Sequence, residues 1–164
     1  MNKFHGQQGY SLMELLIYIA IFIAVSVVII QALVLMMRTY TSAVAYRRLQ
    51  TNGELVMERI IRETRSADSI NVAGSVFGTH PGVLAIQTTD ENNIAHAVTF
   101  SVVNNIVQIN DNGVIGDLSS LEVVVDSLIF RRFTTSNGEG VKVELTLTTA
   151  NGLIVSAPFY STVV

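Results

Sequence analysis

An uninterrupted apolar segment near the N-terminus is the feature that most limits how this chain can fold. Residues 15–37 contain no charged residue, and 21 of these 23 residues are apolar; Ser26 and Gln31 are the two exceptions. At about 1.5 Å per residue, a helix of this length is roughly 34 Å long and exceeds the ~30 Å hydrocarbon core of a bilayer. The segment is apolar on every side, as a lipid-embedded helix is. The sequence therefore predicts a membrane-spanning helix.

Outside this segment, the chain has the composition of an ordinary globular domain. Hydrophobic residues make up 49% of the whole chain and charged residues 14%, and the apolar excess lies in the segment. Residues 1–66 carry a net charge of +3, whereas residues 67–164 carry −6. Because an acidic surface repels phosphate, nucleic acid is not an expected partner of the C-terminal part. The sequence contains no cysteine, which excludes disulfides, thiolate metal sites and thiol catalysis.

Three interpretations of the apolar segment compete: a cleaved secretory signal, a plain single-pass anchor, and a third that depends on the residues just before the segment. A cleaved secretory signal has an apolar stretch of only about 7–15 residues, so the segment is too long to be one. A plain single-pass anchor fits the length but has no use for Glu14, which lies at the edge of the segment. Burying a carboxylate costs about 2.5–3.5 kcal/mol at a helix centre, and less near the interface. Glu14 is therefore either a functional carboxylate or a residue at the level of the lipid headgroups.

The residues around Glu14 resemble a known processing motif. Residues 9–16 read Gly-Tyr-Ser-Leu-Met-Glu-Leu-Leu. This stretch is similar to the cleavage and methylation motif of type IV prepilins and type II secretion pseudopilins. The family pattern is Gly, usually Phe, Thr or Ser, Leu, any residue and Glu, followed by a hydrophobic helix. Tyr10 stands where phenylalanine is most common, which is a mild departure from the pattern.

The resemblance implies roles for these residues. A prepilin peptidase, which is a membrane aspartic peptidase, would cut after Gly9 on the cytoplasmic side, and Tyr10 would become the N-methylated first residue. Glu14 would pair with the α-amine of Tyr10 in a neighbouring subunit. Each charge is costly alone in an apolar bundle, so their pairing would set the register of the subunits. The membrane and polymerisation helix would include Leu15, Leu16, Ile19, Ile23 and Gln31.

An amphipathic helix is expected to continue over residues 38–69. Glu58 and Arg62 form a favourable i,i+4 pair on it. Gly53 is its weak point, because glycine costs about 1 kcal/mol relative to alanine inside a helix. The glycine marks either a bend or a close approach of the sheet. The residues of the apolar stripe lie three or four positions apart, apart from one gap that Thr64 or Glu63 fills. The stripe consists of Tyr46, Leu49, Gly53, Val56, Ile60 and Ala67.

The C-terminal part, residues 70–164, has the composition of β structure, being rich in Val, Ile and Thr. Residues 141–148 alternate strictly, and Pro158 places the last strand at an edge or a bulge. Inward-facing positions are Val141, Val143, Leu145 and Leu147. The other expected strands are residues 83–88, 94–103, 106–110, 128–133 and 153–160, with turns at 111–113, 137–138 and 151–152. The predicted fold class is α+β, with a long N-terminal helix packed on an antiparallel β-sheet; the resemblance makes it pilin-like.

The sequence contains none of the common catalytic motifs. Gly-x-Ser-x-Gly, the Walker A loop and Gly-x-Gly-x-x-Gly are absent. His5, His80 and His96 are scattered, so neither an enzyme nor a cofactor is expected. Asp90 and Glu91 are weak candidates for binding a hard cation, and a solvated turn is the preferred interpretation of that stretch.

These expectations divide the chain into four parts. Residues 1–9 would be a leader removed on processing, and residues 10–37 the transmembrane and polymerisation helix. Residues 38–69 would be its amphipathic continuation, and residues 70–164 the β-rich body. The helix lacks the proline that many major pilins carry, and the body lacks a C-terminal disulfide pair. These departures favour a minor pilin or pseudopilin over a major one. Residues 46–50, 57–63, 141–147 and 159–163 resemble the W-type minor pilins and the J-type minor pseudopilins.

Such a subunit would first be a single-pass protein of the cytoplasmic (inner) membrane and then part of a cell-surface filament. The cytoplasmic position of its N-terminus follows from the resemblance, because the basic residues on the two sides of the segment do not orient it. Its partners would be the prepilin peptidase, the membrane and other pilins or pseudopilins. The alternative is a membrane-anchored extracytoplasmic binding domain that does not polymerise. An anchored hydrolase is a distant third, since the catalytic motifs are missing.

Overall fold

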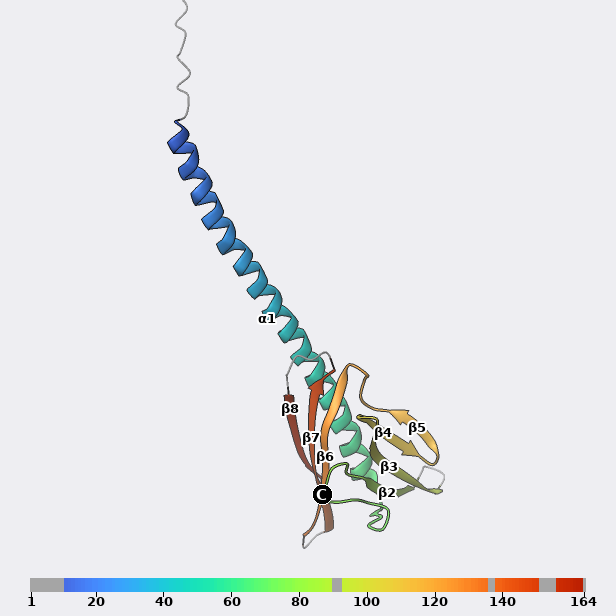
Figure 1. Ribbon diagram of the computed structural model, residues 1–164. Helices are drawn as coiled ribbons and strands as arrows, with labels where there is room; N and C mark the ends of the chain where they lie inside the picture. The colour runs from blue at the N-terminus through green and yellow to red at the C-terminus, as the bar shows by residue number, and fades with distance from the viewer. Residues whose placement is uncertain (1–10, 90–92, 136–137, 151–155, 164) are drawn as a thin grey trace, which may run out of the picture. The chain divides into compact units, whose positions relative to one another are not determined.

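The computed structural model describes residues 11–89, 93–135, 138–150 and 156–163. The chain divides into two compact units, Met1–Thr41 and Ser42–Val164. Helix α1 (Leu12–Ser66) contributes its first part to one unit and its second part to the other, and all the described strands belong to the second unit (Figure 1). The fold class is therefore α+β, as the sequence predicts.

The first unit consists, in its described part, of the apolar portion of α1. An 18-residue window in this helix has a mean hydropathy of 2.9, and none of the window is buried within the protein. By length and composition the helix could cross a membrane, and it is the one such helix among the described residues. The structure therefore confirms that the apolar segment predicted near the N-terminus is helical.

In the second unit, α1 buries one stripe of its surface. The buried residues are Leu49, Gly53, Val56, Met57 and Ile60. This confirms the centre of the predicted stripe, although Tyr46 is 48% exposed. Arg62 Nη1 lies 3.7 Å from Glu58 Oε1, which confirms the predicted i,i+4 pair.

The helix ends at Ser66, three residues before the predicted end. The reason is tertiary pairing, because the backbone after the helix joins a sheet. The amide of Asp68 donates to the carbonyl of Gln87 at 2.8 Å, and the amide of Asn71 donates to the carbonyl of Ala85 at 2.9 Å. Ala67 lies beyond the helix, where it packs on the core.

The strands form two antiparallel sheets rather than the single sheet expected from the sequence. The first sheet has the order β1-β2-β3-β4-β5, and the second has the order β6-β7-β8. A mainly hairpin-connected chain does not reveal where one sheet stops and the next begins, because both contain the same alternating pattern. The strands are β1 (Ser69–Ile70), β2 (Leu84–Thr89), β3 (Ala95–Val103), β4 (Ile106–Asp111), β5 (Val114–Asp117), β6 (Val123–Thr135), β7 (Gly138–Thr149) and β8 (Ser156–Val163).

Strands β1 and β5 are not among the predicted strands, and β6 starts earlier than predicted. Strand β5 is only four residues long, and its Val114 and Ile115 are exposed, so it lacks the alternation that marks a half-buried strand. Strand β6 begins at Val123, five residues earlier than predicted. The register of β6 against β7 shifts between Val125 and Ser127. Such a bulge interrupts the period of two and hides the first part of the strand.

Strand β7 is the central strand of the second sheet, and it confirms the predicted inward face. The four predicted inward-facing side chains are all buried: Val141, Val143, Leu145 and Leu147. Pro158 lies opposite Thr146 in β8, which is an edge strand of this sheet. A proline is tolerated there because it has no amide to donate to a ladder.

A single hydrophobic core joins the helix to both sheets. Leu49 and Ile60 come from α1, Phe100 from the first sheet, and Phe130 and Leu145 from the second, and all five are almost fully buried.

The turn at Asn112 and Gly113 is confirmed, with φ values of 49° and 93° at these residues. Positive φ at both positions is typical of a type I′ hairpin.

Gly53 is a site of close packing rather than a visible break in the helix. A Cβ atom at this position would lie 2.2 Å from Cζ of Phe159 in β8. No side chain fits there unless the aromatic ring moves. The sequence alternatives of a bend and a close approach are therefore decided in favour of the close approach.

We expect Gly53→Ala to destabilise the protein, although glycine-to-alanine changes ordinarily stabilise a helix. The added methyl group would overpack the contact with Phe159 and lower the free energy of unfolding by about 1–3 kcal/mol. Denaturant unfolding of the detergent-solubilised protein measures this effect. Glu54→Ala, at the neighbouring exposed position, is the control and should change stability by less than about 0.5 kcal/mol. The double variant with Phe159→Leu should recover part of the loss; a stabilising Gly53→Ala would contradict the contact.

Candidate functional site

The N-terminal end of α1 contains the carboxylate that the sequence singles out. The carbonyl of Ser11 accepts hydrogen bonds from the amides of Glu14, at 2.9 Å, and Leu15, at 3.2 Å. The first helical turn therefore forms directly after Ser11. Glu14 is the acidic residue of that first turn. Because the helix dipole is positive at this end, a negative charge is more stable here than elsewhere along the helix.

Tyr18 is a partner of this carboxylate that reading the sequence missed. Its hydroxyl group donates to Oε1 of Glu14 at 3.3 Å, one helical turn further along the chain. The sequence feature that indicates this contact is the i,i+4 spacing, which brings two side chains of a helix together. A carboxylate has about four lone-pair positions, so Glu14 keeps capacity for a further donor such as an amine.

The predicted cleavage residues lie outside the described part of the chain. The structure does not describe Gly9 or Tyr10, nor the rest of residues 1–9. Of the three residues to which the resemblance assigns a role in processing or assembly, the structure describes Glu14. The roles of all three residues remain predictions.

The apolar residues assigned to the membrane and polymerisation helix all lie on α1 with exposed side chains. Their exposed fractions range from 47% for Ile19 to 56% for Leu15 and Ile23. In water such a surface would be strongly unfavourable, at about 25 cal/mol for each square ångström of apolar area. It needs a lipid or protein environment to cover it. The residues concerned are Leu15, Leu16, Ile19 and Ile23, together with the polar Gln31.

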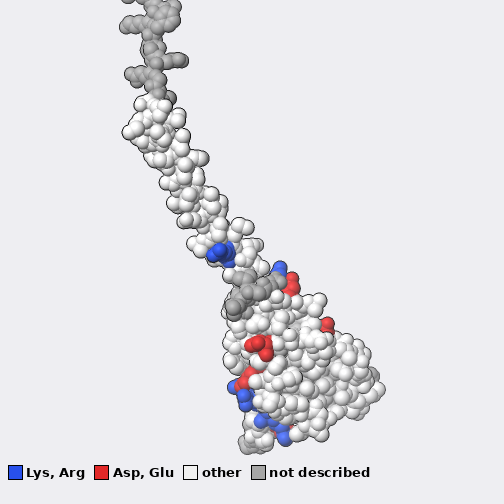
Figure 2. Space-filling view, viewed as in Figure 1, with Lys and Arg blue, Asp and Glu red and all other residues white. Residues whose placement is uncertain are grey.

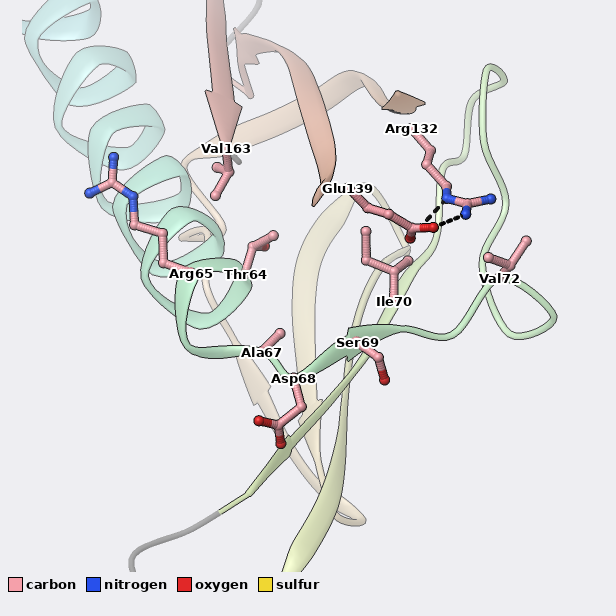
Figure 3. Close-up of a pocket in the computed structure, with 10 residues that line it drawn as sticks. All are labelled: Thr64, Arg65, Ala67, Asp68, Ser69, Ile70, Val72, Arg132, Glu139 and Val163. Atoms are coloured by element: carbon pink, nitrogen blue, oxygen red, sulfur yellow. Dashed lines mark hydrogen bonds and ion pairs between the residues drawn. The ribbon is translucent and has the colours of Figure 1, made fainter. Parts of the chain in front are cut away.

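A cleft in the second unit is the other candidate for a site. It encloses about 470 Å³ between the end of α1, the segment that follows it, and the ends of β6, β7 and β8 (Figure 3). Arg132 and Glu139 form an ion pair on its wall, drawn as dashed lines in Figure 3. Ile70 and Val163 give it an apolar part. The ten labelled lining residues include no histidine, and two of the four charged ones, Arg132 and Glu139, pair with each other.

Charged side chains are sparse on the viewed surface, and uncharged residues cover most of it (Figure 2). On the second sheet, the carboxylate of Glu144 forms ion pairs with two basic side chains. Its Oε1 lies 2.8 Å from Nζ of Lys142 and 3.2 Å from Nε of Arg131. Nζ of Lys142 also lies 5.7 Å from the ring centroid of Tyr160. These contacts fix the cations in a cross-strand cluster.

Hydrogen bonds from Lys142 and then from Arg131 lower the pKa of Glu144 below its ordinary value. In the cleft, the hydrogen bond from Arg132 likewise lowers the pKa of Glu139, and the same contact raises the pKa of Arg132. Both carboxylates are therefore ionised at neutral pH, so these ion pairs are present under ordinary conditions.

The described histidines serve structural contacts. Nδ1 of His80 accepts the amide of Leu128 at 3.0 Å, and Nε2 of His96 lies 3.4 Å from Oδ1 of Asp111. Among the described residues, no three His, Cys, Asp or Glu side chains are placed to bind a metal ion together. Asp90 and Glu91 lie outside the described residues. The weak cation site proposed for them remains a prediction.

Comparisons with protein-family models, with curated proteins and with solved structures find no match to this chain.

We expect Glu144→Gln to destabilise the protein at neutral pH but not in acid. A carboxyl group whose folded-state pKa is lowered stabilises the fold above its unfolded-state pKa, and that contribution is lost as the pH falls through the folded-state value. The difference between wild type and variant should therefore shrink as the pH falls below the ordinary glutamate pKa. Urea unfolding at about pH 7 and about pH 3 measures it. A difference that persists unchanged in acid would contradict the ion-pair cluster; Glu54→Gln is the exposed control.

Proposed function

We propose that this chain is a minor subunit of a type IV pilus or of a type II secretion-like filament. The proposal is supported by Glu14, a carboxylate in the first turn of a helix whose next 23 residues carry no charge. It is supported further by Gly9 at the expected spacing before that carboxylate. A plain membrane anchor gains nothing from an acidic residue in this position.

In this function the helix occupies two apolar environments in turn. Before assembly, the first part of α1 lies in the cytoplasmic membrane as a single span with its N-terminus in the cytoplasm. After a prepilin peptidase cuts behind Gly9, the same surface packs against the helices of other pilins or pseudopilins. The low charge content that suits the bilayer also suits a helix bundle.

Glu14 acts in this proposal as a register device. The amine of a processed Tyr10 in a neighbouring subunit is a cation in an apolar bundle, and the Glu14 carboxylate is an anion there. Leaving either charge unpaired is strongly unfavourable, so the two must meet at one particular stagger of the helices. The Tyr18 hydroxyl holds the carboxylate with a neutral donor. The remaining lone pairs of the Glu14 carboxylate are available to the amine.

The body fits a structural or adaptor role more readily than a catalytic one. The second half of α1 supplies part of the body core, so the same helix that enters the membrane is built into the folded body. We propose that the subunit takes part in starting or capping a filament. The second candidate function is an anchored extracytoplasmic binding domain, which the cleft beside Arg132 and Glu139 favours.

The two functions differ in the N-terminus of the mature protein. We expect Edman sequencing and intact-mass measurement of the membrane-extracted protein to find a chain that starts at N-methylated Tyr10. Production in cells without a prepilin peptidase is the control and should leave Met1 in place. A chain that keeps Met1 in the native host would contradict the pilin function and support the anchored binding domain.

We expect Glu14→Ala to insert into the membrane and to be cut, but to join filaments poorly. The variant removes the carboxylate that offsets the neighbouring amine, so each incorporation leaves an unpaired charge in the bundle. Counting the tagged subunit in sheared filaments, relative to the membrane pool, measures incorporation. Glu54→Ala, on the same helix but in the body, is the matched control and should incorporate normally. Normal incorporation of Glu14→Ala would contradict the proposal that Glu14 sets the register of the subunits.

A further inference from the structure

The polar side chains of the apolar part of α1 fall into two groups. The hydroxyls bond within their own helix: Ser26 Oγ donates to the carbonyl of Phe22 at 2.8 Å, and Thr39 Oγ1 donates to that of Leu35 at 3.0 Å. Gln31 is different. Within the part of the chain that the structure describes, its side-chain amide makes no hydrogen bond, and it lies within the uncharged segment, six residues before the end of that segment at Met37.

An unbonded amide in hydrocarbon is costly, because lipid offers neither donors nor acceptors. A glutamine has two amide hydrogens and a carbonyl oxygen, all of which seek partners. In membranes such side chains bond across to a second helix. The inference that follows rests on α1 crossing the membrane, and it does not depend on processing or on polymerisation.

Mainly apolar side chains surround Gln31 on the surface of α1. Gln31 lies in a shallow groove of about 320 Å³ that is lined by Ile30, Gln31, Val34, Leu35 and Arg38. Residues at spacings of three and four share one face of a helix, so Ala20, Ala24 and Val27 continue this face away from Gln31. The alanines allow two backbones to approach closely. Arg38 ends the face, where its long side chain can reach the headgroups.

The amide itself indicates which helix would fill the groove. A glutamine side chain is its own complement, since the oxygen of one amide accepts a hydrogen of another. Two copies of this chain insert in the same direction and therefore carry Gln31 at the same depth. Any other helix would need a polar residue at that same depth. The second copy meets the requirement automatically and forms the symmetric contact that most homo-oligomers use.

We propose that α1 forms a parallel homodimer in the membrane, with the Gln31 side chains of two copies hydrogen-bonded to each other across the face of Ala24, Val27 and Val34. The dimer exists before any filament is made. It gives the unassembled protein a stable form in which the amide is satisfied, and it brings two bodies together on the outer side.

The absence of native cysteine allows a clean cross-linking test in the full-length protein. Three single-cysteine variants probe the proposed face: Ala24→Cys, Val27→Cys and Val34→Cys. Three more, each two residues away and nearly opposite on the helix, are matched controls at the same depth: Phe22→Cys, Ile29→Cys and Met36→Cys. Membranes from cells without a prepilin peptidase are oxidised with copper phenanthroline. The expected result is a disulfide-linked product of twice the chain mass for the first three variants alone.

The role of the amide is tested separately in the Val27→Cys background. We expect Gln31→Leu to reduce cross-linking and, in a dilution series in liposomes, to weaken association about three- to thirtyfold. Gln31→Asn, which keeps an amide, should retain part of the association. Ser26→Ala removes a hydroxyl that is already bonded within its own helix, so it should leave association unchanged.

Three results would overturn the homodimer. One is equal cross-linking from both faces of the helix, or none from either. Another is a cross-linked product whose mass shows a different membrane protein as the partner. The third is undiminished association of Gln31→Leu. Since no processing occurs in these membranes, a failure here is distinct from a failure of the filament function, which the N-terminus of the mature protein decides.

Discussion

The hydrophobic surface of α1 is the constraint on which the rest of the structure depends. Over its first part the helix is apolar on every side and the protein covers none of it, whereas over its second part only one stripe is apolar and the body covers that stripe. The difference follows from sequence period, because a stripe at spacings of three and four can be buried by one surface and an all-round apolar helix cannot. One helix is therefore suited to two environments along its length.

Inside the body, close packing determines the details. Gly53 allows the ring of Phe159 to lie against the helix, and Phe130 and Phe100 fill the space between the two sheets and the helix. Charges contribute at the surface, where Glu144 is shared between Lys142 and Arg131. Exposed ion pairs of this kind contribute little to the free energy of unfolding, so the buried apolar contacts supply most of the stability of the body.

The polar groups of the apolar helix give the proposals their physical basis. Glu14 is held by Tyr18 within its own helix, yet its charge still needs an opposite charge once water is excluded. Gln31 is neutral, so a second amide is enough to satisfy it. The register of the filament depends on the charge of Glu14, whereas the membrane homodimer depends on the neutral amide of Gln31. The two can succeed or fail independently.

The sequence by itself determined the apolar span, the α+β class, the inward face of β7 and the edge position of Pro158, because each depends on a local period or on the chemistry of one residue. Only the tertiary structure decided that the strands divide into two sheets and that the helix ends at Ser66. Sheet membership and the helix end depend on pairing between segments far apart in sequence, as with Asp68 and Gln87. The rotamers that join Tyr18 to Glu14 are likewise beyond what spacing specifies.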